Sequence, residues 1–132
     1  LRMSRGLGDV YKRQTANLKY IKKSGMNAGL AIKPATDWKE VIPYLPLCDM
    51  VLVMTVEPGY GGQGFIPQCA DKVAMLRKYC NENGFDKMNI QVDGGINTAT
   101  AATVKDAGAN VLVAGTYLFR AKDMKAAADA IR

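Results

Sequence analysis

The sequence predicts an α/β fold built from repeated strand and helix units. Four short apolar runs, at 29–32, 50–54, 90–92 and 111–114, are each followed by a loop with glycine or proline and then by a helical stretch. The second and fourth runs do not alternate apolar with polar residues, which is typical of parallel strands covered on both faces. A doubly wound sheet and a (β/α)8 barrel both consist of such units, and the local pattern does not decide between them.

The first helix is expected at about 16–24, with Thr15 as its cap and Gly25 at its end. Residues 1–14 hold two glycines in a basic, polar stretch that has neither a helical nor a strand period. We expect them to form an unstructured, non-native extension. The folded domain is expected to cover 15–132.

The remaining helices follow from the spacing of apolar residues and from capping residues. A short helix is expected around 38–45, where Asp37 caps its start and Pro43 distorts it. Three regular helices are expected at 68–83, from Asn97 or Thr98 to Ala107, and at about 123–131.

Composition narrows the class of protein. The 132 residues are 48% hydrophobic and can bury one core, and no run approaches the roughly 18 apolar residues that cross a bilayer. We therefore expect a soluble, cytoplasmic protein that does not bind membranes. Residues 1–14 carry +3 of the net charge of +6, and no basic stripe is present, which argues against a nucleic-acid partner. The three cysteines form no CxxC pair and are expected to be reduced, and there is no histidine to act as a metal ligand or general base.

The segment after the second strand is rich in glycine. Four glycines occupy the six positions from Gly59 to Gly64, and their N–H groups can converge on an anion without side chains in the way. A phosphate-binding loop is one interpretation, and a lid or a sharp turn is the other. Met54 ends the strand and either faces the pocket or belongs to the core. Lys33 is a weaker candidate for an ion pair with a phosphate, and Glu57 is a weaker candidate for a second carboxylate.

Two further strand ends carry residues suited to chemistry. Asp93, Gly94 and Gly95 follow the third strand, and Gly115 and Thr116 follow the fourth. Ligands of parallel α/β folds sit at these carboxyl ends, and barrels often hold phosphate with their last two loops. Asp93 can transfer a proton, or it can cap the turn into the next helix.

Four motifs lie at the four strand ends, namely GLAIKPAT at 29–36, MTVEPGYGGQGF at 54–65, IQVDGGI at 90–96 and NVLVAGTYLF at 110–119. In this order they resemble the last four strand ends of ribulose-phosphate 3-epimerases. The resemblance implies a (β/α)8 TIM barrel of the ribulose-phosphate-binding type, with only about the last four βα units present. It also implies the interconversion of D-ribulose 5-phosphate and D-xylulose 5-phosphate through an enediolate, in the pentose phosphate pathway.

The resemblance also assigns roles to individual residues. It makes Asp93 one of two acid–base groups and a ligand of a divalent metal, Zn, Fe, Mn or Co, that stabilises the enediolate. It implies substrate contacts, chiefly to the phosphate, for Met54, Gly59, Tyr60, Gly61, Gly62, Asp93, Gly94, Gly95, Gly115 and Thr116.

The family's partner aspartate, metal-binding histidines and early serine have no counterpart in this sequence. We therefore expect the chain to be inactive by itself. Separately, the resemblance implies that the parent enzyme is a homo-oligomer. Unpaired strand edges predict self-association. Two alternatives are a non-catalytic phosphate-binding half-barrel, and another isomerase, synthase or lyase on the same kind of barrel.

Overall fold

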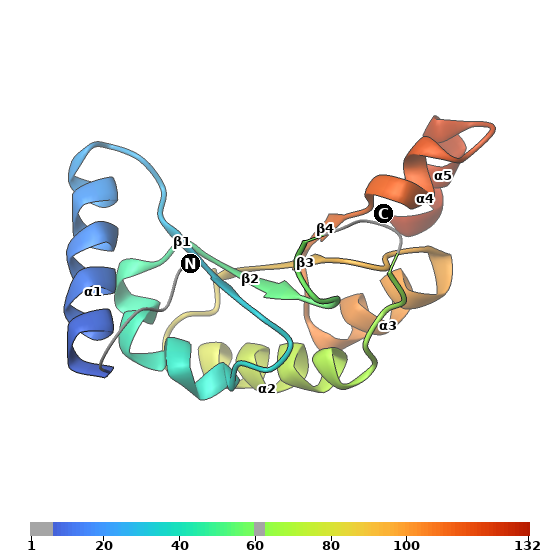
Figure 1. Ribbon diagram of the computed structural model, residues 1–132. Helices are drawn as coiled ribbons and strands as arrows, with labels where there is room; N and C mark the ends of the chain where they lie inside the picture. Colours follow the sequence, from blue (N-terminus) through green and yellow to red (C-terminus); the bar gives the residue numbers. More distant parts are fainter. Residues whose placement is uncertain (1–6, 60–62) are drawn as a thin grey trace.

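The computed structural model describes residues 7–59 and 63–132, with side chains from Arg13 onward (Figure 1). It contains a parallel sheet whose strand order is β1-β2-β3-β4. In a doubly wound sheet the strand order reverses at a switch point, whereas the strands of a barrel follow one another in sequence order. The order observed here is therefore that of a sector of a barrel. The predicted parallel arrangement is therefore confirmed. The strands are β1 (Gly29–Ile32), β2 (Met50–Met54), β3 (Asn89–Asp93) and β4 (Val111–Val113).

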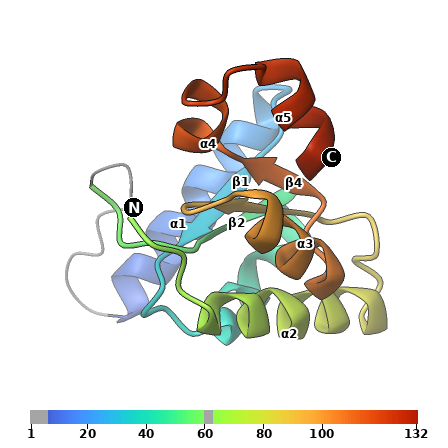
Figure 2. The same cartoon turned by 90° about the vertical axis from the view of Figure 1, so that its right-hand side faces the viewer.

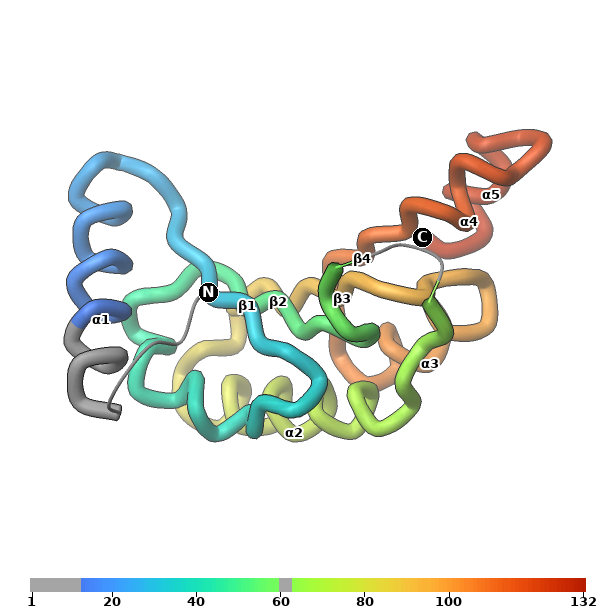
Figure 3. The backbone as a smooth tube through the Cα atoms, viewed as in Figure 1, coloured from blue at the N-terminus to red at the C-terminus, as the bar shows by residue number. Residues whose placement is uncertain are grey.

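The helices lie along one face of the sheet and at its two ends (Figure 1). α1 and the α4–α5 pair stand at opposite ends of the sheet (Figure 3), and α3 lies between α2 and the α4–α5 pair (Figure 2). The segment η1 is a 3-10 helix containing Pro43 and Pro46, which lack the N–H groups that a regular α-helix needs. The helices are α1 (Leu7–Lys23), η1 (Trp38–Leu47), α2 (Gln68–Glu82), α3 (Thr98–Ala107), α4 (Gly115–Phe119) and α5 (Met124–Ile131).

The two faces of the sheet differ in exposure. Val51 and Val53 of β2 are 0% exposed and belong to the core that the helices cover. Met50, Leu52 and Met54 alternate with them and are only half-buried. The prediction that β2 is covered on both faces is therefore wrong for the described residues. The physical reason is that the inner face of a barrel is filled from all eight strands, whereas these four form an open sheet.

The first helix is longer than the sequence predicts. α1 begins at Leu7 rather than near residue 16, so the prediction of an unstructured extension is wrong for residues 7–14, while residues 1–6 lie outside the described part. Lys12, Arg13 and Gln14 are good helix formers and no proline interrupts them, so the helix continues through this stretch despite Gly8. Thr15 is an interior residue of α1 and not its cap.

The three cysteines belong to the hydrophobic core. Cys48, Cys69 and Cys80 are all free and buried. Burial raises the pKa of the Cys48 thiol to about 11, and the negative charge of Asp49 adds to this effect.

Within residues 7–59 and 63–132, no helix combines the length and the apolar character that a membrane crossing needs.

Candidate active site at the carboxyl ends of the strands

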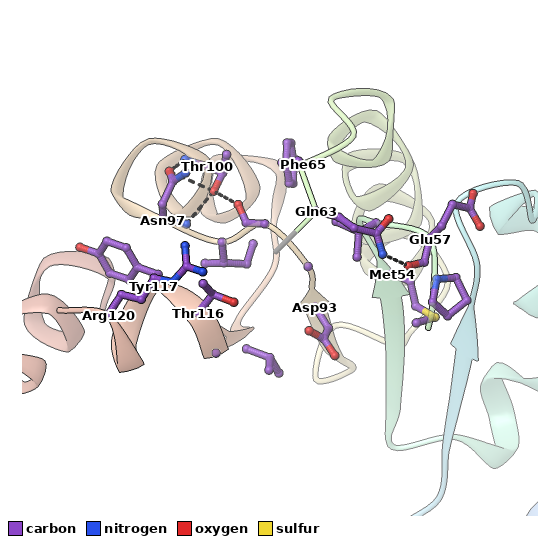
Figure 4. A pocket seen from close by; sticks show the side chains of 18 of the residues that line it. Met54, Glu57, Gln63, Phe65, Asp93, Asn97, Thr100, Thr116, Tyr117 and Arg120 are labelled. Atoms are coloured by element: carbon purple, nitrogen blue, oxygen red, sulfur yellow. Dashed lines mark hydrogen bonds between the residues drawn. The ribbon is translucent and has the colours of Figure 1, made fainter. Parts of the chain in front are cut away.

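A cleft of about 1010 Å³ opens at the carboxyl ends of β2, β3 and β4 (Figure 4). It is bounded by the segment after β2, by the turn from β3 into α3, and by α4. Tyr60, Gly61 and Gly62 lie outside the described residues. The predicted residues that line this cleft are Met54, Gly59, Asp93, Gly94, Gly95, Gly115 and Thr116.

Asp93 is the last residue of β3, and its half-buried side chain lines the cleft. The carboxylate has no hydrogen bond or ion pair with any residue that the structure describes. The alternative role of Asp93 as a helix cap is excluded, because Asn97 caps α3. Met54 is the register partner of Asp93 on the neighbouring strand, so an apolar thioether side chain stands beside the carboxylate.

Thr55 fixes the end of β3 against the segment that follows β2. It is 0% exposed, and its hydroxyl donates to the carbonyl of Gly94. Its N–H donates to the carbonyl of Asp93 over 3.0 Å, and its own carbonyl accepts from the Ile66 N–H over 2.9 Å. One buried residue thus ties together the strand end, the glycine turn and the returning loop. Sequence reasoning missed Thr55, because only its tertiary contacts distinguish it from other threonines.

The turn after β3 has room only for glycine. Gly94 and Gly95 have φ angles of +124° and +67°, a region that L side chains rarely adopt. A Cβ on Gly94 would lie 2.5 Å from Val56, and one on Gly95 would lie 2.7 Å from the Phe65 backbone nitrogen. The Thr100 hydroxyl also holds the Gly95 carbonyl over 2.8 Å. The positions of the N–H groups in this turn are therefore set by close packing.

Gly115, at the start of α4, is a different case. It does not have a positive φ, and a Cβ built on it would meet no described atom within 4 Å outside its chain neighbours and the nearby backbone of its own helix. Neither backbone conformation nor packing explains a glycine here. Because Gly115 lines the cleft, its missing side chain leaves space beside Thr116 that a bound group can occupy.

Hydrogen bonds link the N-terminal end of α3 to α4 at the wall of the cleft. Asn97 and Thr100 form a reciprocal capping box, with the Thr100 N–H donating to Asn97 Oδ1 over 3.0 Å. The hydroxyls of Thr98 and Tyr117 are 2.8 Å apart. These contacts fix the side of the cleft that faces Thr116.

Of the two weaker candidates for site residues, only one lines the cleft, and the structure adds a further residue to the cleft wall. Lys33 is exposed and does not line the cleft, whereas Glu57 is exposed and does. Arg120 also lines the cleft, and sequence reasoning missed it. It follows Thr116 by four residues, so a prediction of the short helix α4 would have placed both on one helical face.

The described residues do not fit a complete divalent-metal centre. Such a centre in an enzyme generally has about three protein ligands. Over residues 7–59 and 63–132, no group of three or more histidine, cysteine, aspartate or glutamate side chains could hold a metal ion. Asp93 at the end of β3 could contribute one ligand.

Comparisons with known proteins agree on one family. The sequence model of the ribulose-phosphate 3 epimerase family matches residues 9–119. A ribulose-phosphate 3-epimerase of Schizosaccharomyces pombe is 48% identical over 100 residues, covering 76% of this chain and 42% of the relative. The one from Escherichia coli is 39% identical over 115 residues, covering 87% and 51%. A ribulose-5-phosphate-3-epimerase of Arabidopsis thaliana, named as chloroplastic, is 42% identical over 123 residues, covering 93% and 43%.

A solved structure supports the fold. The crystal structure of 3-hexulose-6-phosphate synthase matches with a TM-score of 0.60 and 19% identity, covering 89% of this chain and 53% of that one. At this identity the likeness concerns the fold alone. The chain spans about half of the length of the curated relatives it matches, from 41% to 51% for those of yeast and bacterial origin.

Proposed function

This chain belongs to the ribulose-phosphate 3-epimerase family, and from that premise we propose that it takes part in the interconversion of D-ribulose 5-phosphate and D-xylulose 5-phosphate. The observation that carries the proposal is Asp93, a half-buried carboxylate at a strand end that faces the cleft and has no partner among the described residues. Structural carboxylates are usually paired or used as caps, and this one is available to a ligand.

Asp93 acts as a base on one face of the sugar. The C3–H bond breaks and its proton passes to the carboxylate. Its electron pair forms a C2=C3 double bond, while the π pair of the C2 carbonyl moves onto oxygen to give an enediolate. Met54 stands beside Asp93 and covers the reacting carbons with an apolar side chain. Return of a proton from the opposite face would give the other epimer.

The phosphate is held at the other end of the cleft. The turn at Gly94 and Gly95 presents backbone held by close packing, and Gly115 leaves room beside Thr116. Glycine-bearing turns bind phosphate well because N–H groups can approach the oxygens closely. We assign the same role to Gly59, Tyr60, Gly61 and Gly62 from the family resemblance.

In the proposed reaction, Asp93 supplies only some of the groups that epimerisation needs, and the described residues do not supply the others. Asp93 provides one acid–base group and one ligand for a divalent metal, Zn, Fe, Mn or Co. Inversion at C3 needs a base on one face of the sugar and an acid on the other. The chain contains no histidine. The 132 residues by themselves are therefore proposed to be inactive as an epimerase.

A deuterium-exchange experiment tests this function. Each of the two pentulose phosphates is incubated with the chain in D2O, with Fe, Zn or Mn added, and NMR follows both deuterium at C3 and formation of the other sugar. We expect exchange at C3 of one sugar without conversion, and loss of exchange in Asp93→Asn. The matched control is Asp106→Asn, an exposed carboxylate on α3 that does not line the cleft.

The outcomes separate the candidates. Deuterium exchange at C3 that persists in Asp93→Asn would contradict the role of that residue. Conversion by the unmodified chain would contradict the proposed inactivity. Binding of the sugars without exchange would favour the second candidate, a non-catalytic phosphate-binding half-barrel, which is supported by the lack of a metal-holding cluster in the described part of the chain.

Two further proposals concern assembly and location. β1 and β4 are the edges of the sheet, and unpaired edges favour association, so we propose that the chain self-associates, which sedimentation at several concentrations would test. A cytoplasmic location remains a prediction, since one relative is named as chloroplastic.

A further inference from the structure

Arg120 is the one cationic side chain among the described residues that line the cleft. The other ionisable groups there are Glu57, Asp93 and Tyr117. An anionic ligand that enters this cleft therefore meets two carboxylates and one positive charge, and the position of that charge decides which way the ligand lies.

The charges are separated within the cleft. Arg120 lies on the side of Thr116, Tyr117 and Asn97, Met54 and Glu57 lie on the other side, and Asp93 lies between the two groups (Figure 4). A phosphate is repelled by carboxylates and attracted by guanidinium. A sugar phosphate would thus place its phosphate toward α4 and its carbon chain toward Asp93.

The guanidinium of Arg120 is not used to hold the protein together. It has no hydrogen bond or ion pair with any described residue. By contrast, Arg77 donates to the Gly108 carbonyl over 2.9 Å, and Arg132 lies 3.9 Å from Asp129. The backbone of Arg120 is nevertheless fixed, because its N–H donates to the Thr116 carbonyl over 3.0 Å.

We propose that Arg120 binds the phosphate of the sugar substrate, together with Thr116 on the same helical face, and thereby sets the direction in which the sugar lies. The inference rests on the proposed function and adds a binding residue to it. A guanidinium can make two parallel hydrogen bonds to phosphate oxygens, which strengthens the contact and fixes its geometry. Gly115, directly before Thr116, leaves the space that the phosphate would fill.

The test compares binding by the full chain and by three variants. NMR titrations with D-ribulose 5-phosphate, inorganic phosphate and unphosphorylated D-ribulose give the dissociation constants. In Arg120→Gln we expect the affinity for both phosphorylated ligands to fall about ten- to hundred-fold, the range for a charge-assisted contact, with binding of D-ribulose unchanged. Arg120→Lys should retain part of the affinity, because it keeps the charge but loses the fork. Lys122→Gln is the matched control, an exposed cation that does not line the cleft.

Each outcome bears on the inference. Equal binding by the unmodified chain and Arg120→Gln would overturn it, and so would an equal loss in Lys122→Gln, which would indicate unspecific attraction of anions. Failure of the unmodified chain to bind phosphate or D-ribulose 5-phosphate would also overturn it. Phosphate binding through Arg120 without any exchange at C3 would support the inference while contradicting the proposed catalysis. Circular dichroism of each variant confirms that it is folded.

Discussion

Substitution by alanine should lower stability at one glycine of the cleft and ligand affinity at another. Gly95→Ala adds a methyl group where the backbone has a φ of +67° and where the Cβ would lie 2.7 Å from the Phe65 nitrogen. The left-handed conformation costs an L residue about 1–2 kcal/mol, and overpacking costs about 1–3 kcal/mol more. The free energy of unfolding should therefore fall by about 2–5 kcal/mol, a large part of the stability of a small domain.

Gly115→Ala should leave stability almost unchanged and weaken binding. Among the described residues, the Cβ meets no atom within 4 Å beyond its local backbone, and the φ is not positive. The change in the free energy of unfolding should therefore stay within about 0.5 kcal/mol, the scale of surface substitutions. The methyl group would occupy space that a phosphate needs. Crowding of about 1 kcal/mol or more corresponds to affinity for D-ribulose 5-phosphate that is lower by about five-fold or more.

Urea unfolding followed by fluorescence measures the first effect. The protein has one tryptophan, Trp38, whose ring centroid is 5.8 Å from that of Tyr79, so its emission reports on packing of η1 against α2. NMR titration measures the second effect. The reasoning is refuted if Gly95→Ala is as stable as the unmodified chain, or if Gly115→Ala binds the sugar phosphate with unchanged affinity.

Three further predictions concern Thr55, Asp49 and Cys48. Thr55→Val should lower the free energy of unfolding by about 1–3 kcal/mol, because it leaves the Gly94 carbonyl unpaired, whereas Thr103→Val on the exposed side of α3 should change urea unfolding little. The hydrogen bonds that Lys22 and the Ala28 N–H donate to Asp49 lower the pKa of that carboxyl below its usual 3.8. Asp49→Asn should therefore cost about 1 kcal/mol at neutral pH, and urea titrations should show this difference from the unmodified chain vanish as the pH falls through the folded-state pKa. Since the Cys48 pKa is raised to about 11, its reaction with a disulfide reagent near pH 8 should be about 100-fold slower than that of an ordinary thiol and become fast in urea.

Much of the fold could be predicted because its signals are local. The bounds of β1 and β2 match the apolar runs, and Asp37, Asn97 and Asp123 cap helices as their short polar side chains favour. The start of α1 could not be predicted from a hydrophobic period, since residues 7–14 extend the helix by propensity. The strand order that identifies a barrel sector depends on contacts between distant segments.

The candidate site was predictable at its glycines and at Asp93, where residue type itself is unusual for a strand end. It was not predictable at Thr55, because burial and three hydrogen-bonding partners come from tertiary structure. Arg120 was missed because a five-residue helix such as α4 gives no periodic signal. Only the folded chain shows that its side chain lines the same cleft as Asp93.

The two ends of the cleft differ in chemistry but share one support. Asp93 belongs to the end that would remove a proton, and Gly95 to the turn that leads toward the phosphate end, yet both lie within three residues on β3 and its turn. Thr55 holds this stretch through the Asp93 and Gly94 carbonyls, and Thr100 holds it through Gly95. A change at Thr55 should therefore weaken both binding and proton exchange, whereas Asp93→Asn should abolish exchange alone and Arg120→Gln should act through binding. In the proposed function, the same residues that stabilise the turn would also fix the distance between Asp93 and the bound phosphate, which decides whether C3 reaches Asp93.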